Sequence, residues 1–329
     1  MIVNFVGNYQ QGIVGEEADQ IHITREIEAL GHTVQRVPQD IWREYVRGER
    51  NPDWDSKLPI KADINIITKW HHFYDGSFVT KLREMTGAPV FYWVWDYMED
   101  NGIPQWHMLM AKCSDLYLTN EYGIKNKYRS YGEVLKNLYY FPFDVCDGEL
   151  PVYRSLQKPY EVVFFGSCIG QGHRIEWLEK INKEVPVTCF AWNHEEWTKR
   201  GFTAYPAVYG DIFNKMVSHS KVILGFSVNP DCWGYWSNRV GKIITAGGFM
   251  LYEYAPGMEL MIGDAMEYFS SPEEAIEKIK YWVSHDEERI QREIQNRDLR
   301  NRFTSKTRIK QLMILADRFI KTKGTTWNY

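Results

Sequence analysis

The stretch SNRVGKIITAGGFML, residues 237–251, contains the signals that decide the fold of this chain. The pattern predicts a helix that is capped by Ser237 and continues for two turns. The helix ends at a glycine pair, and an apolar strand follows. A serine cap leaves the first backbone N–H groups of the helix, at residues 238–240, free to face a ligand. A helix end of this kind favours an anion, and a diphosphate is a common occupant.

Two cations beside the cap support an anion site. The guanidinium of Arg239 is a forked donor that matches phosphate oxygens, and Lys242 stands one turn further along. The pair Gly247 and Gly248 would let the following loop pass close to a ligand. The alternative is a plain helix that ends at Gly247, with both cations solvated.

The composition excludes several classes of protein. The chain has 329 residues and a formal net charge of -4, which gives no general attraction to nucleic acid or to an anionic membrane. Its five cysteines form no CxxC pair, which favours a reduced, cytoplasmic protein over a disulfide or zinc framework. The first residues resemble a strand more than a signal peptide, and no apolar run reaches the ~20 residues of a membrane helix.

Short apolar runs alternate with helical patterns in the first half, which is typical of parallel α/β units. Between the first two runs, apolar residues at helical spacing predict a helix that ends at Gly31. This order of strand, glycine-containing turn, helix and strand is a Rossmann-like opening. The strands expected in this half are residues 2–7, 33–37, 64–68, 89–95 and 115–119.

The pattern breaks around residues 150–160 and then begins again. A helix is expected over residues 272–284. Ser271 would cap it, Pro272 would occupy its first position, and Glu274 would complete a capping box. A second Rossmann-like domain follows from this repetition, and ligands bind outside the carboxyl ends of such sheets. The strands expected here are residues 161–167, 187–192, 221–226, 248–252 and 266–269.

Three segments follow from these patterns. Residues 1–150 form one Rossmann-like domain and residues 151–304 form a second. Residues 305–329 are a carboxyl-terminal helix and tail, and the helix, near residues 305–321, should bury Ile309, Leu312, Met313, Ala316 and Phe319. Two such domains predict a site between them.

The second half resembles the carboxyl half of glycosyltransferases of the CgeB/YkvP type, which are distantly similar to the large retaining family of nucleotide-sugar transferases. The resemblance covers the second half well and the first half only in its layout. It implies a GT-B fold: α/β, with two Rossmann-like domains whose parallel sheets face each other across a cleft, and a last helix that packs back toward the first domain. The elements that carry it are Ser237, Arg239, the turn Ala246-Gly247-Gly248, Pro256-Gly257 with Glu259, Phe269, the segment 303–312 with Arg308, and the Arg174-bearing segment 162–181.

The resemblance implies a nucleotide-diphosphate sugar as the donor substrate, with a UDP-sugar first in order. It also implies that residues 151–304 bind this donor and that residues 1–150 bind the acceptor. One position departs from the family, because many relatives have an acidic residue near Lys242 that holds the ribose hydroxyls. A lysine cannot accept those hydrogen bonds, so Lys242 serves the phosphates or another residue takes the ribose. The donor-binding residues that we expect are Gly166, Ser167, Arg174, Trp192, Asn193, Tyr209, Ser237, Asn238, Arg239, Lys242, Gly247 and Gly248.

The first domain should supply the general base that glycosyl transfer to a hydroxyl requires. Asp96 ends an apolar strand and is the first candidate, and His72 is the second. A plain helix cap is the alternative for Asp96. Four further residues are expected to face the same space and contact the acceptor: Asn8, Gln10, Gln11 and His71.

The expected partners are the donor and an acceptor that is a glycan, a protein, a small molecule or a hydroxymethylated DNA base. DNA would require a basic surface, and Lys125, Lys127, Arg129 and Lys136 form one local cluster. A solvated face is the alternative for that cluster. No motif predicts a metal site, and no membrane segment is expected. Two other functions stay open: a nucleotide-sugar-binding protein without activity, and a sugar-nucleotide epimerase of the same fold.

Overall fold

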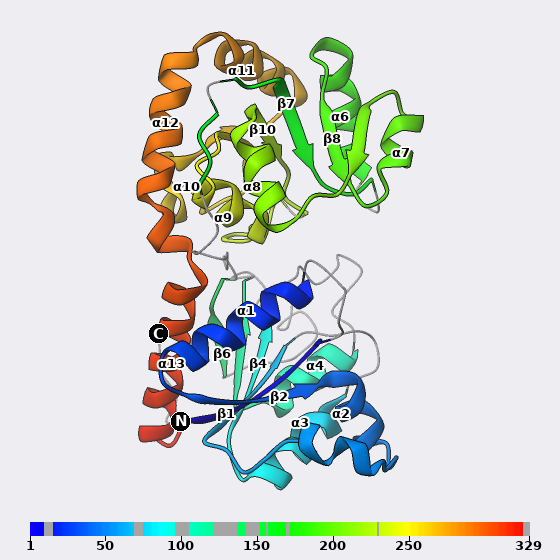
Figure 1. Cartoon of the computed structure of the whole chain (residues 1–329), viewed down its shortest axis with the longest axis vertical. Coiled ribbons are helices and arrows are strands. Elements are labelled where there is room, and N and C mark those ends of the chain that lie inside the picture. The colour runs from blue at the N-terminus through cyan, green and yellow to red at the C-terminus, as the bar shows by residue number, and fades with distance from the viewer. Residues whose placement is uncertain are drawn as a thin grey trace. The chain divides into compact units, whose positions relative to one another are not determined.

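The computed structural model describes residues 1–9, 16–68, 75–95, 105–120, 137–142, 152–155, 157–168, 172–228 and 230–324. The chain divides into two compact units (Figure 1). The first contains Met1–Phe143 together with Ser305–Tyr329, and the second contains Asp144–Thr304.

The first unit is a six-stranded parallel sheet with helices on both faces. Its strand order is β2-β1-β3-β4-β5-β6, and the first five positions follow the flavodoxin-like order. A 3-10 turn, Pro52–Lys57, lies between α2 and β3. The elements are β1 Ile2–Gly7, α1 Glu16–Ala29, β2 Thr33–Pro38, α2 Gln39–Val46, β3 Ile64–Thr68, α3 Gly76–Thr86, β4 Val90–Val94, α4 Gln105–Cys113, β5 Leu116–Thr119, β6 Leu138–Tyr140 and α13 Ser305–Lys321.

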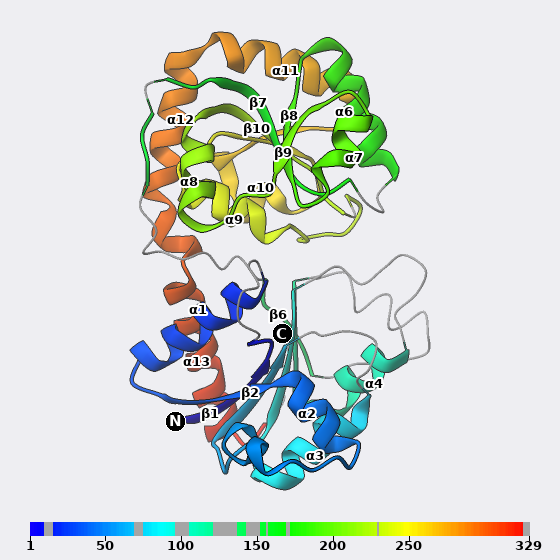
Figure 2. The ribbon, with the colours of Figure 1, turned by 45° about the vertical axis from the view of Figure 1, so that its right-hand side comes forward.

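The last helix belongs to the first unit although it comes from the far end of the chain. It lies beside α1, as both views show (Figures 1 and 2). Phe319 of α13 packs edge-on against Phe91 of β4, with ring centroids 5.1 Å apart. The predicted face of α13 is buried at Ile309, Leu312, Met313 and Ala316, whereas Phe319 is half-buried. Helices α2, α3 and α4 cover the opposite face of the sheet.

The second unit is also a six-stranded parallel sheet. Its order, β12-β11-β10-β7-β8-β9, is the Rossmann order in which the first and fourth strands lie side by side. The elements are β7 Tyr160–Phe165, α6 Gly172–Glu184, β8 Thr188–Ala191, α7 His194–Lys199, β9 Thr203–Pro206, α8 Gly210–Ser218, β10 Ser220–Gly225, α9 Asn238–Thr245, β11 Met250–Glu253, α10 Met258–Met261, β12 Glu267–Phe269, α11 Pro272–Ser284 and α12 Asp286–Asp298.

Two apolar layers hold the second sheet between its helices. Helices α6, α7 and α11 pack on one face, where Trp197 is fully buried and its indole Nε1 donates to the Gly166 carbonyl at 2.9 Å. Helices α8, α9 and α10 pack on the other face. Since both faces are covered, the strands are apolar on both sides, as a parallel sheet requires.

Every predicted strand and helix is present, with small shifts at the ends. Strands β6 and β9 were not predicted, and neither were helices α2, α7 and α12. The cap of α11 forms as expected, because Ser271 Oγ accepts from the Glu274 N–H at 3.1 Å. The reciprocal half of the capping box is different, since the Glu274 carboxylate accepts from the Ser270 N–H at 2.7 Å, one residue earlier than predicted.

Candidate active site

The second sheet has a topological switch point between β7 and β10. The chain leaves these neighbouring strands in opposite directions, toward α6 after β7 and toward α9 after β10. Loops that diverge in this way open a crevice at the carboxyl edge of the sheet, where such folds bind ligands. Side chains on the first turns of α6 and α9 are therefore the first candidates for ligand contacts.

Arg174, in the first turn of α6, is a buried cation at this point. Its Nη2 donates to the Ser167 carbonyl at 2.9 Å, and its guanidinium lies 5.7 Å from the centre of the Phe164 ring. Only 6% of its surface is exposed. Burial, and next the positive charge of Arg239, lower the pKa of Arg174 to about 10. The two arginines from α6 and α9 therefore lie close enough to repel each other.

Arg239 is half-buried in the first turn of α9. Its guanidinium makes no ion pair with any carboxylate of the described residues. Burial lowers the pKa of Arg239, and the phenols of Tyr252, Tyr235 and Tyr209 oppose that effect. Two neighbouring, partly desolvated arginines repel each other, and an anion that contacts both would relieve the repulsion.

The amino end of α9 offers fewer free amides than the sequence predicted. Ser237 caps the helix, because its Oγ accepts from the Arg239 N–H at 3.3 Å. The Val240 N–H donates to the Ser237 carbonyl at 3.0 Å. Of the three N–H groups expected to be free, those of Arg239 and Val240 are thus used by the cap itself. Positive charge at this end of α9 therefore comes mainly from the arginine side chains.

A histidine and a glutamate beside the arginines were missed by sequence analysis. His173 Nε2 lies 3.1 Å from the carboxylate of Glu253, which ends β11 and is 3% exposed. The same carboxylate accepts from the Ser227 N–H at 3.1 Å. The hydrogen bond to Glu253 raises the pKa of His173. A glutamate that ends a buried strand and a histidine next to Arg174 are the signals that could have revealed this pair. We call His173, Arg174, Arg239 and Glu253 the switch-point cluster.

The His173–Glu253 contact predicts a pH-dependent contribution to stability. The folded-state pKa of His173 is above 6.5, so its contribution is full below that pH and is lost as pH rises through the raised value. We expect the stability difference between the wild type and His173→Gln to shrink from pH 5.5 to pH 9. Because the imidazole is 35% exposed, the difference should stay below about 1 kcal/mol. Urea unfolding at several pH values measures it, and parallel pH profiles of the two proteins would contradict the assignment.

The remaining donor candidates surround the carboxyl ends of β7 and β8. Gly166 is held by backbone contacts, and Ser167 is half-buried and bound to Arg174. Asn193 ties the two loops together, because its Oδ1 accepts from the Cys168 N–H at 3.1 Å. Trp192 and Tyr209, by contrast, are 66% and 44% exposed, so their rings are available for stacking.

Gly247 and Gly248 lie at the opposite end of α9 from Arg239. They close the helix in a Schellman motif, with the Gly247 N–H on the Ile244 carbonyl at 2.9 Å and the Gly248 N–H on the Ile243 carbonyl at 3.0 Å. Gly247 has φ of 77°, and a Cβ there would lie 2.7 Å from Arg297 Nε. The structure thus gives both glycines a packing role. Lys242 is half-buried between the two ends of the helix.

A pair of glycine substitutions separates backbone strain from crowding. Gly201 follows α7 at the same helix-end position, with φ of 84°, and a Cβ there would meet nothing within 4 Å. Gly201→Ala should cost about 1 kcal/mol through the left-handed backbone alone. Gly247→Ala should cost roughly 2–3 kcal/mol, because Arg297 must also move. Denaturant unfolding measures the free energy of unfolding of both variants. Equal losses of stability would show that Arg297 can move away from residue 247 at no cost.

The candidates of the first unit are only partly described. Asn8 follows β1 and is buried, and its N–H donates to Gln20 Oε1 at 2.5 Å. The other predicted residues lie outside the described part of the chain, as does the basic cluster at 125–136. These are Gln10, Gln11, His71, His72 and Asp96.

Two surveys of the described residues bear on cofactors and membranes. No group of three or more histidine, cysteine, aspartate or glutamate side chains in the described ranges is arranged to hold a metal ion. No described helix combines the length and the apolar character of a membrane span. Among the cysteines in the described ranges, Cys113, Cys168, Cys189 and Cys232 form no disulfide.

Comparison with known proteins identifies the class of fold. Residues 173–314 match a family model described as "Glycosyl transferase-like". No curated protein matches the chain significantly in sequence. Three solved structures align over nearly the whole chain. Sucrose-phosphate synthase from Thermosynechococcus elongatus has a TM-score of 0.69 at 9% identity and covers 98% of this chain and 99% of its own.

The other two solved structures were determined with UDP and glucose or with uridine diphosphoglucose. Anabaena Alr3699/HepE in complex with UDP and glucose has a TM-score of 0.64 at 12% identity, over 96% of this chain and 99% of its own. The DNA-modifying enzyme β-glucosyltransferase, solved with and without uridine diphosphoglucose, has a TM-score of 0.63 at 15% identity. The alignment covers 98% of this chain and 99% of the enzyme's own.

The chain therefore has the GT-B fold of glycosyltransferases. Its second unit, which contains the switch-point cluster, also matches a glycosyl transferase-like sequence family over most of its length.

Proposed function

We propose that this protein is a glycosyltransferase that moves a sugar from a nucleotide-diphosphate sugar to an acceptor hydroxyl. The observation that carries the proposal is the pair Arg174 and Arg239, which lie together at the switch point of the second sheet without a carboxylate partner for Arg239 among the described residues. Two structural neighbours were solved with UDP or UDP-glucose, which supports a UDP-sugar as the donor.

The arginines would act on the leaving group. As the glycosidic bond to the diphosphate breaks, negative charge grows on the phosphate oxygens. Fixed guanidinium groups in a desolvated site stabilise that charge without having to reorganise. Glu253 raises the pKa of His173, so the imidazole stays protonated to higher pH as a hydrogen-bond donor beside the arginines, while the Glu253 carboxylate balances its charge. With two fixed guanidinium charges at the leaving group, transfer would not need a metal ion, and the site would be metal-independent.

The donor and acceptor contacts complete the proposal. Trp192, which is largely exposed after β8, would stack on the nucleobase. Asp96 would accept the proton of the acceptor hydroxyl, with His72 as the second candidate. The role of Asp96 rests on its sequence position, two residues after the end of β4. Gly247 and Gly248 would shape α9 and leave the donor contacts to Ser237, Asn238 and Arg239.

A donor screen tests the function. The protein is incubated with UDP-, GDP- and TDP-sugars in the absence of an acceptor, and the products are separated by anion-exchange chromatography. A transferase should release free sugar and nucleoside diphosphate slowly from one class of donor. An isomerised sugar nucleotide would instead assign an epimerase. Thermal stabilisation by every donor without any product would assign a binding protein, and either result would overturn the proposal.

A further inference from the structure

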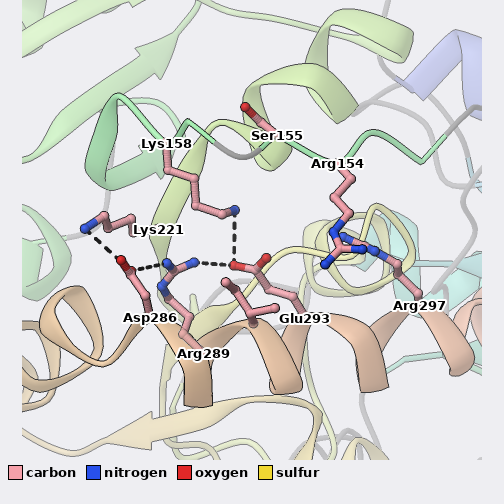
Figure 3. A pocket seen from close by; sticks show the side chains of 9 residues that line it. Arg154, Ser155, Lys158, Lys221, Asp286, Arg289, Glu293 and Arg297 are labelled. Carbon is pink, nitrogen blue, oxygen red and sulfur yellow. Dashed lines mark hydrogen bonds and ion pairs between the residues drawn. The ribbon is translucent and has the colours of Figure 1, made fainter.

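A cavity of about 100 Å³ lies in the second unit between α12 and the segment that leads into β7. Figure 3 shows its walls, with Arg154 and Lys158 on one side and Arg289, Glu293 and Arg297 on α12 on the other. Such a volume holds several water molecules, or one group about the size of a phosphate.

The walls of this cavity carry an excess of positive charge. Five cationic side chains face two carboxylates, which leaves three positive charges, although the whole chain has a net charge of -4. Glu293 is shared by Lys158, at 3.1 Å, and Arg289, at 2.5 Å. The other carboxylate, Asp286, pairs with Arg289 and lies 3.6 Å from Lys221.

Arg154 and Arg297 are the cations that these carboxylates do not reach. Neither guanidinium has an ion pair or a hydrogen bond to the described part of the chain. Their side chains approach each other from opposite walls in Figure 3. Like charges placed this way repel, and an anion between them would relieve the repulsion.

Two buried N–H groups also lack acceptors. Arg289 is 1% exposed, and its Nε has no hydrogen-bond partner among the described residues. The Nε of Arg297 is likewise buried without one in that part of the chain. Buried donors without acceptors are costly, so their presence on a polar cavity indicates a missing acceptor. Burial lowers the pKa of Lys158 in spite of its contact with Glu293, and the charges of Arg289 and Arg297 lower it further.

We propose that this cavity is a binding site for a phosphate group, either inorganic phosphate or a phosphate ester, held by Arg154 and Arg297. A dianion with several acceptor oxygens suits two forked donors better than a single carboxylate does. The site is distinct from the switch-point cluster. Arg297 packs against Gly247 at the carboxyl end of α9, whereas Arg239 lies at the amino end of that helix.

Calorimetric titration with sodium phosphate tests the site, at constant ionic strength and with UDP present in excess to fill any nucleotide site. Wild-type protein should bind one phosphate saturably. Arg154→Gln and Arg297→Gln should each weaken binding about tenfold or more. Arg154 is exposed, so its replacement leaves the fold intact even if Arg297→Gln is less stable. The matched control is Arg25→Gln, which removes an exposed cation of α1 that forms no ion pair with the described part of the chain.

Two further titrations distinguish the sources of the anion and the location of the site. Glycerol 3-phosphate in place of phosphate shows whether the cavity admits an ester, and binding by either probe supports the proposal. Arg239→Gln should leave phosphate binding unchanged. The proposal is overturned if wild-type protein binds neither probe, if the cavity variants bind as well as wild type, or if only Arg239→Gln weakens binding.

Discussion

Arg239→Gln is expected to lower kcat/KM for sugar transfer, or for donor hydrolysis, by about 100- to 1,000-fold. The reason is that the guanidinium would be a fixed positive charge at the place where the leaving diphosphate gains negative charge. Arg239→Lys should recover only part of the activity, because it keeps the charge but loses the forked geometry. Initial rates at several donor concentrations give the ratio for each variant.

The same substitution should not destabilise the protein. Arg239 has no ion pair within the described residues and is partly desolvated, so removing its charge removes an unfavourable term from the folded state. We expect the thermal midpoint of Arg239→Gln to equal or exceed that of the wild type. Loss of activity together with a lower midpoint would indicate that Arg239 has a structural role instead.

Glu293→Ala is expected to lower the free energy of unfolding by about 3–5 kcal/mol. Glu293 is 4% exposed and accepts from Arg289 and Lys158, which are both buried. Its removal leaves two buried cations without this carboxylate. Denaturant unfolding monitored through the second unit measures the loss. The control is Glu277→Ala, an exposed position on α11 that should change stability by no more than about 0.5 kcal/mol.

A combined variant distinguishes the cost of leaving buried charges unpaired from the cost of lost packing. Replacing Lys158 and Arg289 by methionine together with Glu293→Leu removes all three buried charges at similar volume. This variant should be more stable than Glu293→Ala alone. If it is less stable, the cost of Glu293→Ala comes from packing, and the account of a charge-coupled cluster is wrong.

Local signals predicted most of the fold. The cap of α9 at Ser237 and the bounds of α11 and α13 depend on neighbouring residues, and the sequence indicated them correctly. Strand β9, Thr203–Pro206, was missed because it is an exposed edge strand that ends in proline. Its strand character comes from pairing with β8, which no local pattern contains.

Contacts between distant residues limited the prediction of the site. His173 and Glu253 are 80 positions apart, and only the parallel order β11-β10-β7 brings them together. The free amides of α9 were overestimated because the serine cap uses the Arg239 N–H itself. The cavity beside α12 could not be predicted either, since its charges come from residues 154–158, 221 and 286–297.

The most direct test of the central claim compares the affinities of UDP and uridine for wild-type protein and for the double variant Arg174→Gln/Arg239→Gln. Calorimetry gives both dissociation constants, and their ratio isolates the contribution of the diphosphate. We expect wild-type protein to bind UDP at least about 100-fold more tightly than uridine, and the double variant to lose most of that preference. An equal preference in both proteins would show that these arginines do not hold the diphosphate.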